Sequence, residues 1–336
     1  MRNKINGFWL SPTYGCNNRC RYCYVGGKLG INRDADLGDL ERYVKQMVSL
    51  GAKNCILIGG EPTTYPNLTD LVRFASNLGL SVKMVTNGRR LADPSFVMDL
   101  KSAGLQHCTI SLEGLEPVHD GITQVAGSFS QSVAGICNCR EKGIAVNSIT
   151  TVSCFNKGTI EDLVIFLRSL KVRRSIFNMC SSQPSGYKGQ IGSGVLSLAE
   201  YARIVESVGL RHEGLIFYTL VPLCLFDQAK LQQLVELGRV KTTCSLFSRV
   251  VAIDPEGNIL PCTHMAGINY GNLNDPDSYS GLIARKEAEI EYLKTHAPSD
   301  RCVSCQLWNR CLGGCNLIWF SHNAQECIPG LPNIAS

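Results

Sequence analysis

The chain has 336 residues, of which 44% are hydrophobic and 18% charged, a balance that suits a globular protein with a sizeable core. Its net charge of +5 includes no long basic run, so the composition gives no indication of nucleic-acid binding. The sequence has no signal peptide and no apolar run of membrane-spanning length, so we expect a cytoplasmic protein of about two domains.

The first predicted strand, residues 8–11, leads into a loop with three cysteines. Cys16, Cys20 and Cys23 are spaced C-x3-C-x2-C, which lets one loop ligate one iron–sulfur cluster through three thiolates. A four-iron cluster bound in this way keeps one iron open to a ligand from outside the protein. Structural zinc is the alternative, but it usually needs four protein ligands, and no fourth Cys or His stands nearby in the sequence.

Strands and helices then alternate as far as residue 185. Further strands are predicted at 54–58, 81–86, 106–111, 144–152 and 175–180, and helices at 37–50, 68–78, 93–103, 129–142 and 160–170. This α/β alternation predicts a parallel sheet that right-handed crossovers curl into a barrel or partial barrel. The C-terminal ends of its strands would then carry the functional groups.

Three motifs follow predicted strands directly. They are Gly59-Gly60-Glu61-Pro62, Thr86-Asn87-Gly88 and Ser111-Leu112-Glu113-Gly114. Glycine lets backbone come close to a ligand, and the Glu61 carboxylate can accept a hydrogen bond from an ammonium group. One such motif alone would indicate a turn, whereas three in order behind the cysteine loop indicate a binding site. On strand 144–152, Ser148 and Thr150 are further candidates, of which we predict Thr150 as the contact.

The cysteine loop, with Tyr22 before its last cysteine, and the three motifs resemble the radical S-adenosylmethionine (SAM) superfamily. The resemblance implies a partial (β/α)6 barrel over residues 1–185, in which SAM chelates the open iron. It also implies that SAM is cleaved to a 5′-deoxyadenosyl radical, which removes a hydrogen atom from the substrate. The implied SAM contacts are Gly59, Gly60, Glu61, Pro62, Asn87, Ser111, Glu113 and Thr150.

A second cysteine system follows a bridging region, residues 186–235, in which helices are predicted at 196–208 and 229–237. Residues 250–262 predict a β-hairpin that turns at Asp254-Pro255-Glu256-Gly257. Seven cysteines accompany it: Cys244, Cys262, Cys302, Cys305, Cys311, Cys315 and Cys327. This pattern resembles the SPASM domain, a module with two auxiliary clusters, and implies such a domain over residues 236–336.

The cysteine count agrees with three [4Fe–4S] clusters. Two fully ligated auxiliary clusters need one thiolate more than the motif supplies, and Cys224 is the predicted addition. The resemblance implies a crossed arrangement, with Cys224, Cys244, Cys262 and Cys315 on the first cluster and Cys302, Cys305, Cys311 and Cys327 on the second. An open site on the first cluster and a pair of structural zinc sites are the alternatives. His264 is expected either near the first cluster or on the surface.

The resemblance implies an enzyme that modifies a ribosomally made peptide by oxidation, crosslinking or epimerisation. A dehydrogenase or epimerase of a sugar or aminocyclitol is the alternative. A non-catalytic iron–sulfur scaffold or electron carrier would not need the strand-end motifs. We expect an external electron donor of the flavodoxin or ferredoxin kind. Because fifteen residues precede Cys16, we also expect a leader peptide to need a separate binding protein or another surface.

Cys180 is the candidate for chemistry on the substrate radical. It ends the predicted strand 175–180 and shares one face with Asn178, because side chains alternate along a strand. An inward thiol there could donate a hydrogen atom to a carbon radical and invert a stereocentre, with Cys154 as a second candidate. A buried structural thiol is the alternative. Oxidation, with the electron passing to the first auxiliary cluster, is the fate that we favour.

Overall fold

The computed structural model describes residues 4–25, 28, 34–180, 194–218, 221–241, 244, 248–264, 269–275, 281–296 and 300–315. Its sheet has nine strands in the order β7-β6-β5-β4-β3-β2-β1-β8-β9. The strands are β1 (Gly7–Leu10), β2 (Asn54–Leu57), β3 (Ser81–Thr86), β4 (His107–Ser111), β5 (Ala145–Val152), β6 (Ser175–Met179), β7 (Leu215–Phe217), β8 (Val250–Ile253) and β9 (Ile259–Leu260). All neighbours from β7 to β8 pair in parallel, and β9 pairs antiparallel with β8.

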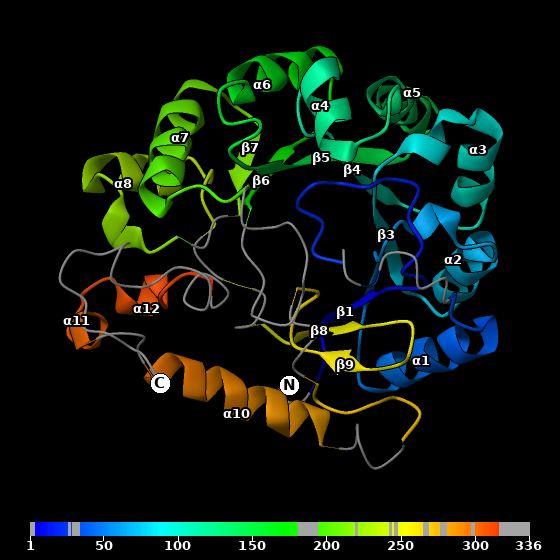
Figure 1. Cartoon of the computed structure of the whole chain (residues 1–336). Coiled ribbons are helices and arrows are strands. Elements are labelled where there is room, and N and C mark those ends of the chain that lie inside the picture. The colour runs from blue at the N-terminus through cyan, green and yellow to red at the C-terminus, as the bar shows by residue number, and fades with distance from the viewer. Residues whose placement is uncertain are drawn as a thin grey trace.

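Helices connect the parallel strands and cover one face of the sheet. The helices that lie between strands in the chain are α1 (Leu37–Ser49), α2 (Leu68–Asn77), α3 (Pro94–Ser102), α4 (Glu116–Thr123), α5 (Ser128–Glu141), α6 (Ile160–Ser169), α7 (Leu198–Arg211) and α8 (Gln228–Glu236). Three more described helices follow β9 and connect no strands: α10 (Leu282–Thr295), α11 (Asp300–Val303) and α12 (Trp308–Cys311). Figure 1 shows α1 to α7 in an arc outside the sheet, with β8, β9 and α10 toward its open side. None of the described helices combines the length and the apolarity that a membrane crossing requires.

Short-range signals explain where several helices begin. Asp36 caps α1, because its carboxylate accepts from the backbone N–H groups of Gly38 and Asp39. Ser197 and Glu200 form a reciprocal capping box at α7. These caps satisfy backbone donors that a helix start leaves open, so the helices begin where the sequence places a short polar side chain.

Side chains along the strands point alternately to a buried face and to a partly exposed face of the sheet. In β5, Val146, Ser148, Thr150 and Val152 are buried, while the residues between them are partly exposed. The buried face packs against the helices in two hydrophobic clusters, one over β1 to β5 and one around β6 and β7. The other face is the open, concave inner wall of the predicted partial barrel.

The sheet extends beyond the six predicted strands at both edges. β7, in the predicted bridging region, pairs in parallel with β6, and β8 of the predicted hairpin pairs in parallel with β1. The hairpin itself is confirmed by the antiparallel pairing of β8 and β9. The cysteine-rich region is therefore joined to the barrel by a shared sheet edge, while the domain boundaries at 185 and 235 stay a prediction.

Candidate active site and metal centre

The three-cysteine loop follows β1 and is held by α4. The backbone N–H groups of Arg19 and Arg21 donate to the carbonyls of Thr123 and Ile122 at the C-terminal end of α4, at 3.0 Å each. Within the loop, Cys23 N donates to Cys20 O at 3.1 Å. The sequence prediction lacks α4, because its eight residues are few and include a proline and a glycine.

The thiols of this loop lie close enough to influence one another. Burial, with the charges of Glu61 and Cys23 as smaller contributions, raises the pKa of Cys16 to about 12, although a hydrogen bond from Asn18 N opposes the shift. Burial and the charge of Cys23 also raise the pKa of Cys20. Cys16 and Cys20 are therefore protonated in the metal-free chain, and metal binding must release their protons.

The chemistry of this donor set fits an iron–sulfur cluster, because thiolates are the soft donors that such clusters take. A cubane takes each thiolate on a separate iron, which three neighbouring thiols on one loop can provide.

The Glu61 carboxylate joins the first strand-end motif to the second. Its Oε1 accepts from Thr63 N at 3.0 Å and from the hydroxyls of Thr63 and Thr86 at 2.6 Å each. Its Oε2 accepts from Asn87 N at 2.7 Å. The side chain is 1% exposed. Three of these donors reach Oε1 and one reaches Oε2, so Oε2 can still accept a hydrogen bond, and the expected ammonium contact of Glu61 stays a prediction.

Gly59 and Gly60 let this motif approach the backbone that precedes Cys16. A Cβ atom on Gly59 would lie 2.5 Å from Thr13 O, and one on Gly60 would lie 2.3 Å from Gly15 O. Gly60 N donates to Thr13 O at 3.1 Å, and Glu61 N donates to Gly15 O at 2.7 Å. The glycines thus serve the packing of the motif on the cysteine loop, while Pro62 starts the short turn that follows.

Asn87 in the second motif also holds the cysteine loop. Its Nδ2 donates to Asn17 Oδ1 at 2.6 Å, and Ser132 Oγ donates to Asn87 O at 2.7 Å. Arg89, two residues later, donates to Asn18 Oδ1 at 3.0 Å. Sequence reasoning missed Asn17 and Arg89, because an amide between two cysteines and a single arginine after a strand give no signal without the fold.

Glu113 in the third motif is buried beside Tyr22, which precedes Cys23. Burial raises the pKa of Glu113 to about 7, although the nearby Tyr22 and a hydrogen bond from Thr151 N oppose the shift. Thr151 N donates to Glu113 Oε2 at 2.8 Å. Ser111, at the start of the motif, pairs with Ile149 on the concave face. The motif therefore lies between the cysteine loop and the inner wall.

Thr150, the predicted contact on β5, lies on the side of the strand that faces the helices, and its contact with SAM stays a prediction. Its hydroxyl donates to Leu112 O at 2.6 Å, and the residue is fully buried. Thr150 lies opposite Phe177, which packs against α6 and α7, so its side chain points to the helices. Its neighbours Ile149 and Thr151 have the concave position instead, because side chains alternate along β5.

Cys180 follows β6 and is 2% exposed. Burial, followed by the charges of Glu113 and Cys154, raises the pKa of its thiol to about 12. By alternation it shares the concave side with Asn178, which pairs with Thr151. The structure therefore brings Cys180 close to Glu113 at the end of the sheet that bears the cysteine loop, whereas its role as a hydrogen-atom donor stays a prediction.

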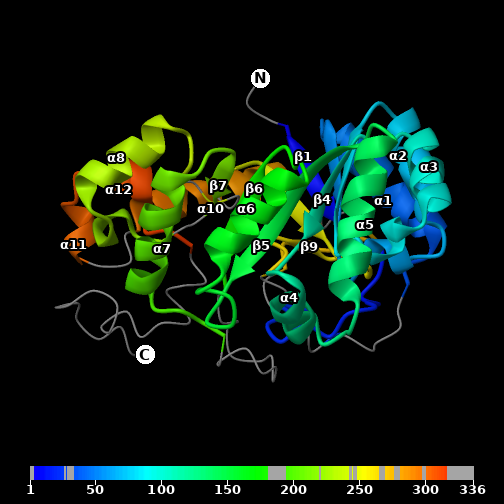
Figure 2. The ribbon, with the colours of Figure 1, turned by 90° about the horizontal axis from the view of Figure 1, so that it is seen from above.

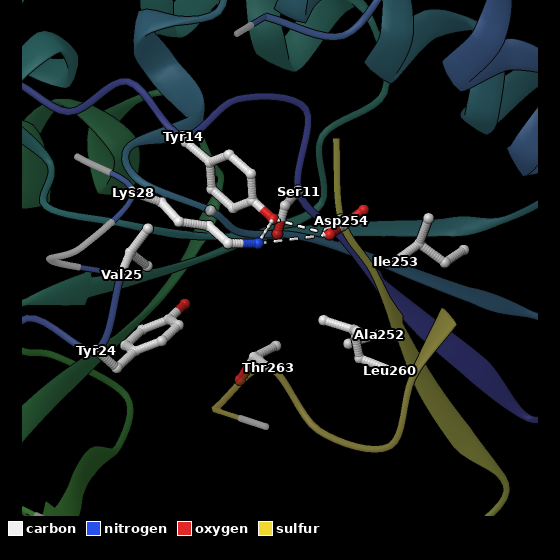
Figure 3. A pocket seen from close by; sticks show the side chains of 11 residues that line it. Ser11, Tyr14, Tyr24, Val25, Lys28, Ala252, Ile253, Asp254, Leu260 and Thr263 are labelled. Atoms are coloured by element: carbon white, nitrogen blue, oxygen red, sulfur yellow. Dashed lines mark hydrogen bonds and ion pairs between the residues drawn. The ribbon is translucent and has the colours of Figure 1, made fainter. Parts of the chain in front are cut away.

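A three-residue clamp connects the cysteine loop to the turn of the hairpin, a link that sequence reasoning missed. Tyr14 Oη donates to Asp254 Oδ2 at 2.9 Å, and Lys28 Nζ donates to Tyr14 Oη at 2.8 Å. Figure 3 shows these side chains above a pocket that Tyr24 and Thr263 also line. The clamp brings the end of the hairpin, which carries Cys262, toward the three-cysteine loop.

Cys224 lies in a short turn (Leu223–Leu225) near two other cysteines of the C-terminal region. Leu223 N donates to Cys311 Sγ at 3.3 Å, and the charges of Cys311 and Cys305 add to burial in raising the pKa of the Cys224 thiol. The resemblance instead implies that Cys224 ligates the first auxiliary cluster, whereas Cys305 and Cys311 ligate the second. The observed neighbours of Cys224 favour Cys305 and Cys311 as partners, and Figure 2 shows α12 gathered with α7 and α8.

The remaining predicted ligands are distributed over the same region. Cys244 is buried, Cys262, Cys302 and Cys315 are partly buried, and Cys327 lies outside the described residues. Their thiol groups supply the soft donors that iron–sulfur clusters take. The assignment of each cysteine to a cluster stays a prediction.

Comparison with known proteins adds an independent line of evidence. The family model of the Radical SAM superfamily matches residues 10–170. Fe-coproporphyrin III synthase of Methanosarcina barkeri is 28% identical over 49% of this chain, and the match spans 41% of that relative. PqqA peptide cyclase of Ruegeria pomeroyi is 26% identical over 90% of this chain and 80% of its own length.

Among solved structures, Streptococcus suis SuiB bound to its precursor peptide SuiA has the same fold. It covers 94% of this chain and 72% of its own length, with a TM-score of 0.69 and 19% sequence identity. The shared fold includes the cysteine-rich C-terminal region as well as the barrel, because the match extends over nearly the whole chain.

Proposed function

The chain belongs to the radical SAM superfamily, and from this premise we propose that it generates a 5′-deoxyadenosyl radical and uses it to modify a peptide. The residues that would hold the cluster are Cys16, Cys20 and Cys23. When bound, the cluster supplies the electron that cleaves the sulfonium of SAM. The main observation behind the proposal is the loop with three neighbouring thiols. All three strand-end motifs lie against this loop.

The chain's own residues orient this loop and the bound SAM. Glu61 and Asn87 fix the loop through the hydrogen bonds described above. We propose that backbone groups of Gly59, Gly60 and Pro62 contact the methionine end of SAM, and that Asn87, Ser111 and Glu113 contact the rest. The partly exposed Ile149 and Ile176 line the inner wall beyond these groups, and such apolar side chains exclude water from a reactive radical.

A peptide substrate is supported by relatives that span the whole fold. PqqA peptide cyclase matches over 90% of this chain, and SuiB has been crystallised with a precursor peptide. A porphyrin-like small molecule is the second candidate, because the match to Fe-coproporphyrin III synthase has the higher identity over a shorter segment. The chain spans about half the length of the first curated relatives that it matches.

The C-terminal cysteines extend the proposal to two auxiliary clusters. The candidate ligands are Cys224, Cys244, Cys262, Cys302, Cys305, Cys311, Cys315 and Cys327. An external flavodoxin-like or ferredoxin-like protein would supply electrons, and a separate protein would bind a leader peptide. Support for two clusters comes from the number and spacing of these thiols.

The substrate class is tested with the anaerobically reconstituted protein, SAM and dithionite. Short peptides encoded beside its gene are added one at a time, and 5′-deoxyadenosine and peptide mass are measured. We expect one peptide to increase 5′-deoxyadenosine formation and to change in mass. Stimulation by Fe-coproporphyrin III and by none of the peptides would instead establish the small-molecule candidate.

The role of Cys180 distinguishes two fates of the substrate radical, which are hydrogen-atom donation and oxidation. Its position beside Glu113 supports hydrogen-atom donation, whereas the auxiliary clusters support oxidation, which remains the fate that we propose. Turnover in D2O distinguishes them in wild type and Cys180→Ala. A product two hydrogens lighter, formed equally by both proteins, is the expected result. Deuterium in an otherwise unchanged product, lost in the variant, would establish epimerisation through Cys180.

A further inference from the structure

Two aromatic rings connect the three-cysteine loop to the end of the hairpin. Tyr24 follows Cys23 directly, and His264 stands two residues after Cys262. Their ring centroids are 4.2 Å apart with an interplanar angle of 35°. One ring therefore comes from each of two thiol-bearing segments that are far apart in the sequence.

His264 also faces the thiol of its own segment. Its Nδ1 lies 3.8 Å from Cys262 Sγ and 3.1 Å from Thr263 Oγ1. A thiolate bound to iron has no proton and can only accept a hydrogen bond, so the Nδ1 atom that faces it must carry the proton.

Tyr24 fixes the plane of the His264 ring. Its hydroxyl interacts with the side chain of Thr263, and both residues line the pocket in Figure 3. Because Tyr24 stacks on one face of the imidazole and contacts Thr263, the Nδ1 atom of His264 is held facing the sulfur of Cys262.

We propose that His264 sets the reduction potential of the auxiliary cluster that Cys262 ligates, with Tyr24 as the positioning residue that holds the imidazole in place. An N–H donor to a ligand sulfur stabilises the electron-rich reduced state, and hydrogen bonds of this kind raise cluster potentials. A higher potential favours acceptance of an electron from an oxidised substrate. The inference rests on the proposed auxiliary cluster at Cys262.

The test is an anaerobic redox titration of the holoenzyme, followed by electron paramagnetic resonance, with iron content measured on each sample. His264→Leu removes the donor, and His264→Asn keeps an N–H close to the position of Nδ1. Tyr24→Leu removes the stacking partner. His212→Leu is the matched control, because His212 pairs with Glu161 at the end of α7, away from the cysteine segments.

We expect one midpoint potential to become more negative in His264→Leu and in Tyr24→Leu, and to return toward the wild-type value in His264→Asn. The other potentials and the control should not change. Equal potentials in wild type and His264→Leu, with all clusters present, would overturn the inference. If His264→Leu does not retain the cluster, a wild-type potential in Tyr24→Leu overturns it. A wild-type protein with only about four irons would instead refute the auxiliary clusters themselves.

Discussion

The carboxyl group of Glu113 has a property that the sequence does not predict. The sequence predicts a contact with SAM, and the structure shows a carboxyl whose burial raises its pKa to about 7. A buried acid that is half-ionised at neutral pH makes stability depend on pH in a defined direction.

The folded-state pKa of Glu113 lies above its ordinary value of 4.5, so the folded chain binds a proton that the unfolded chain has released. The resulting stability is complete below pH 4.5 and is lost as pH rises through 7. Between pH 6 and pH 8 we expect the wild type to lose about 1 kcal/mol that Glu113→Gln does not lose. Urea unfolding at both pH values measures the difference.

Glu200→Gln is the control for this prediction. Glu200 is exposed, and its hydrogen bonds with Lys157 and Ser197 lower its pKa to about 2, far below the range of the measurement. Its replacement should not alter the pH dependence between 6 and 8. An identical pH dependence in wild type and Glu113→Gln would show that Glu113 is already ionised at pH 6.

Cys224 gives a second prediction at the residue scale. Because its neighbours are Cys311 and Cys305, we expect Cys224→Ala to remove or convert the cluster that contains those two cysteines. Mössbauer spectra of the iron-57 protein report the change, and the melting temperature should fall because cluster ligation couples to folding. Cys137→Ala, on α5, is the control. An unaltered spectrum with full activity would make Cys224 an ordinary thiol.

At the scale of elements, the sequence predicts most strands and helices of the barrel, but not the short elements and the strand pairing that complete it. Strands such as 81–86 coincide with the structure because their apolar and β-branched residues alternate. The sequence misses α4 and β7, which are too short for a periodic pattern. It cannot show that β8 pairs with β1, because pairing between distant segments depends on tertiary packing.

The strand-end motifs were predicted as ligand contacts, and the structure adds that they brace the cysteine loop. Gly60→Ala tests this, since its Cβ atom would lie 2.3 Å from the carbonyl oxygen of Gly15. We expect a loss of at least about 2 kcal/mol in unfolding free energy and weaker retention of the cluster.

Gly158→Ala provides the comparison, because a Cβ atom there meets nothing within 4 Å. It should change the unfolding free energy by less than about 0.5 kcal/mol. If Gly60→Ala retained iron and stability as well as Gly158→Ala does, the close packing of the motif on the loop would have no energetic importance.

At the scale of the whole molecule, one sheet carries both cysteine systems. β1 leads into the three-cysteine loop, and β8 at its side leads through the hairpin to Cys262. The clamp of Tyr14, Lys28 and Asp254 and the stacked pair of Tyr24 and His264 connect the same two segments. This arrangement places Cys262, a proposed ligand of an auxiliary cluster, toward the three-cysteine loop, as the proposed oxidation of the substrate requires.

The most direct measurement is the yield of 5′-deoxyadenosine from SAM and dithionite, together with the iron content of the anaerobically reconstituted chain. We predict about twelve irons and product formation in the wild type, and about eight irons with no product in the variant that replaces Cys16, Cys20 and Cys23 by Ala. Equal product from both proteins, or no product from a fully loaded wild type, would contradict radical chemistry at this loop.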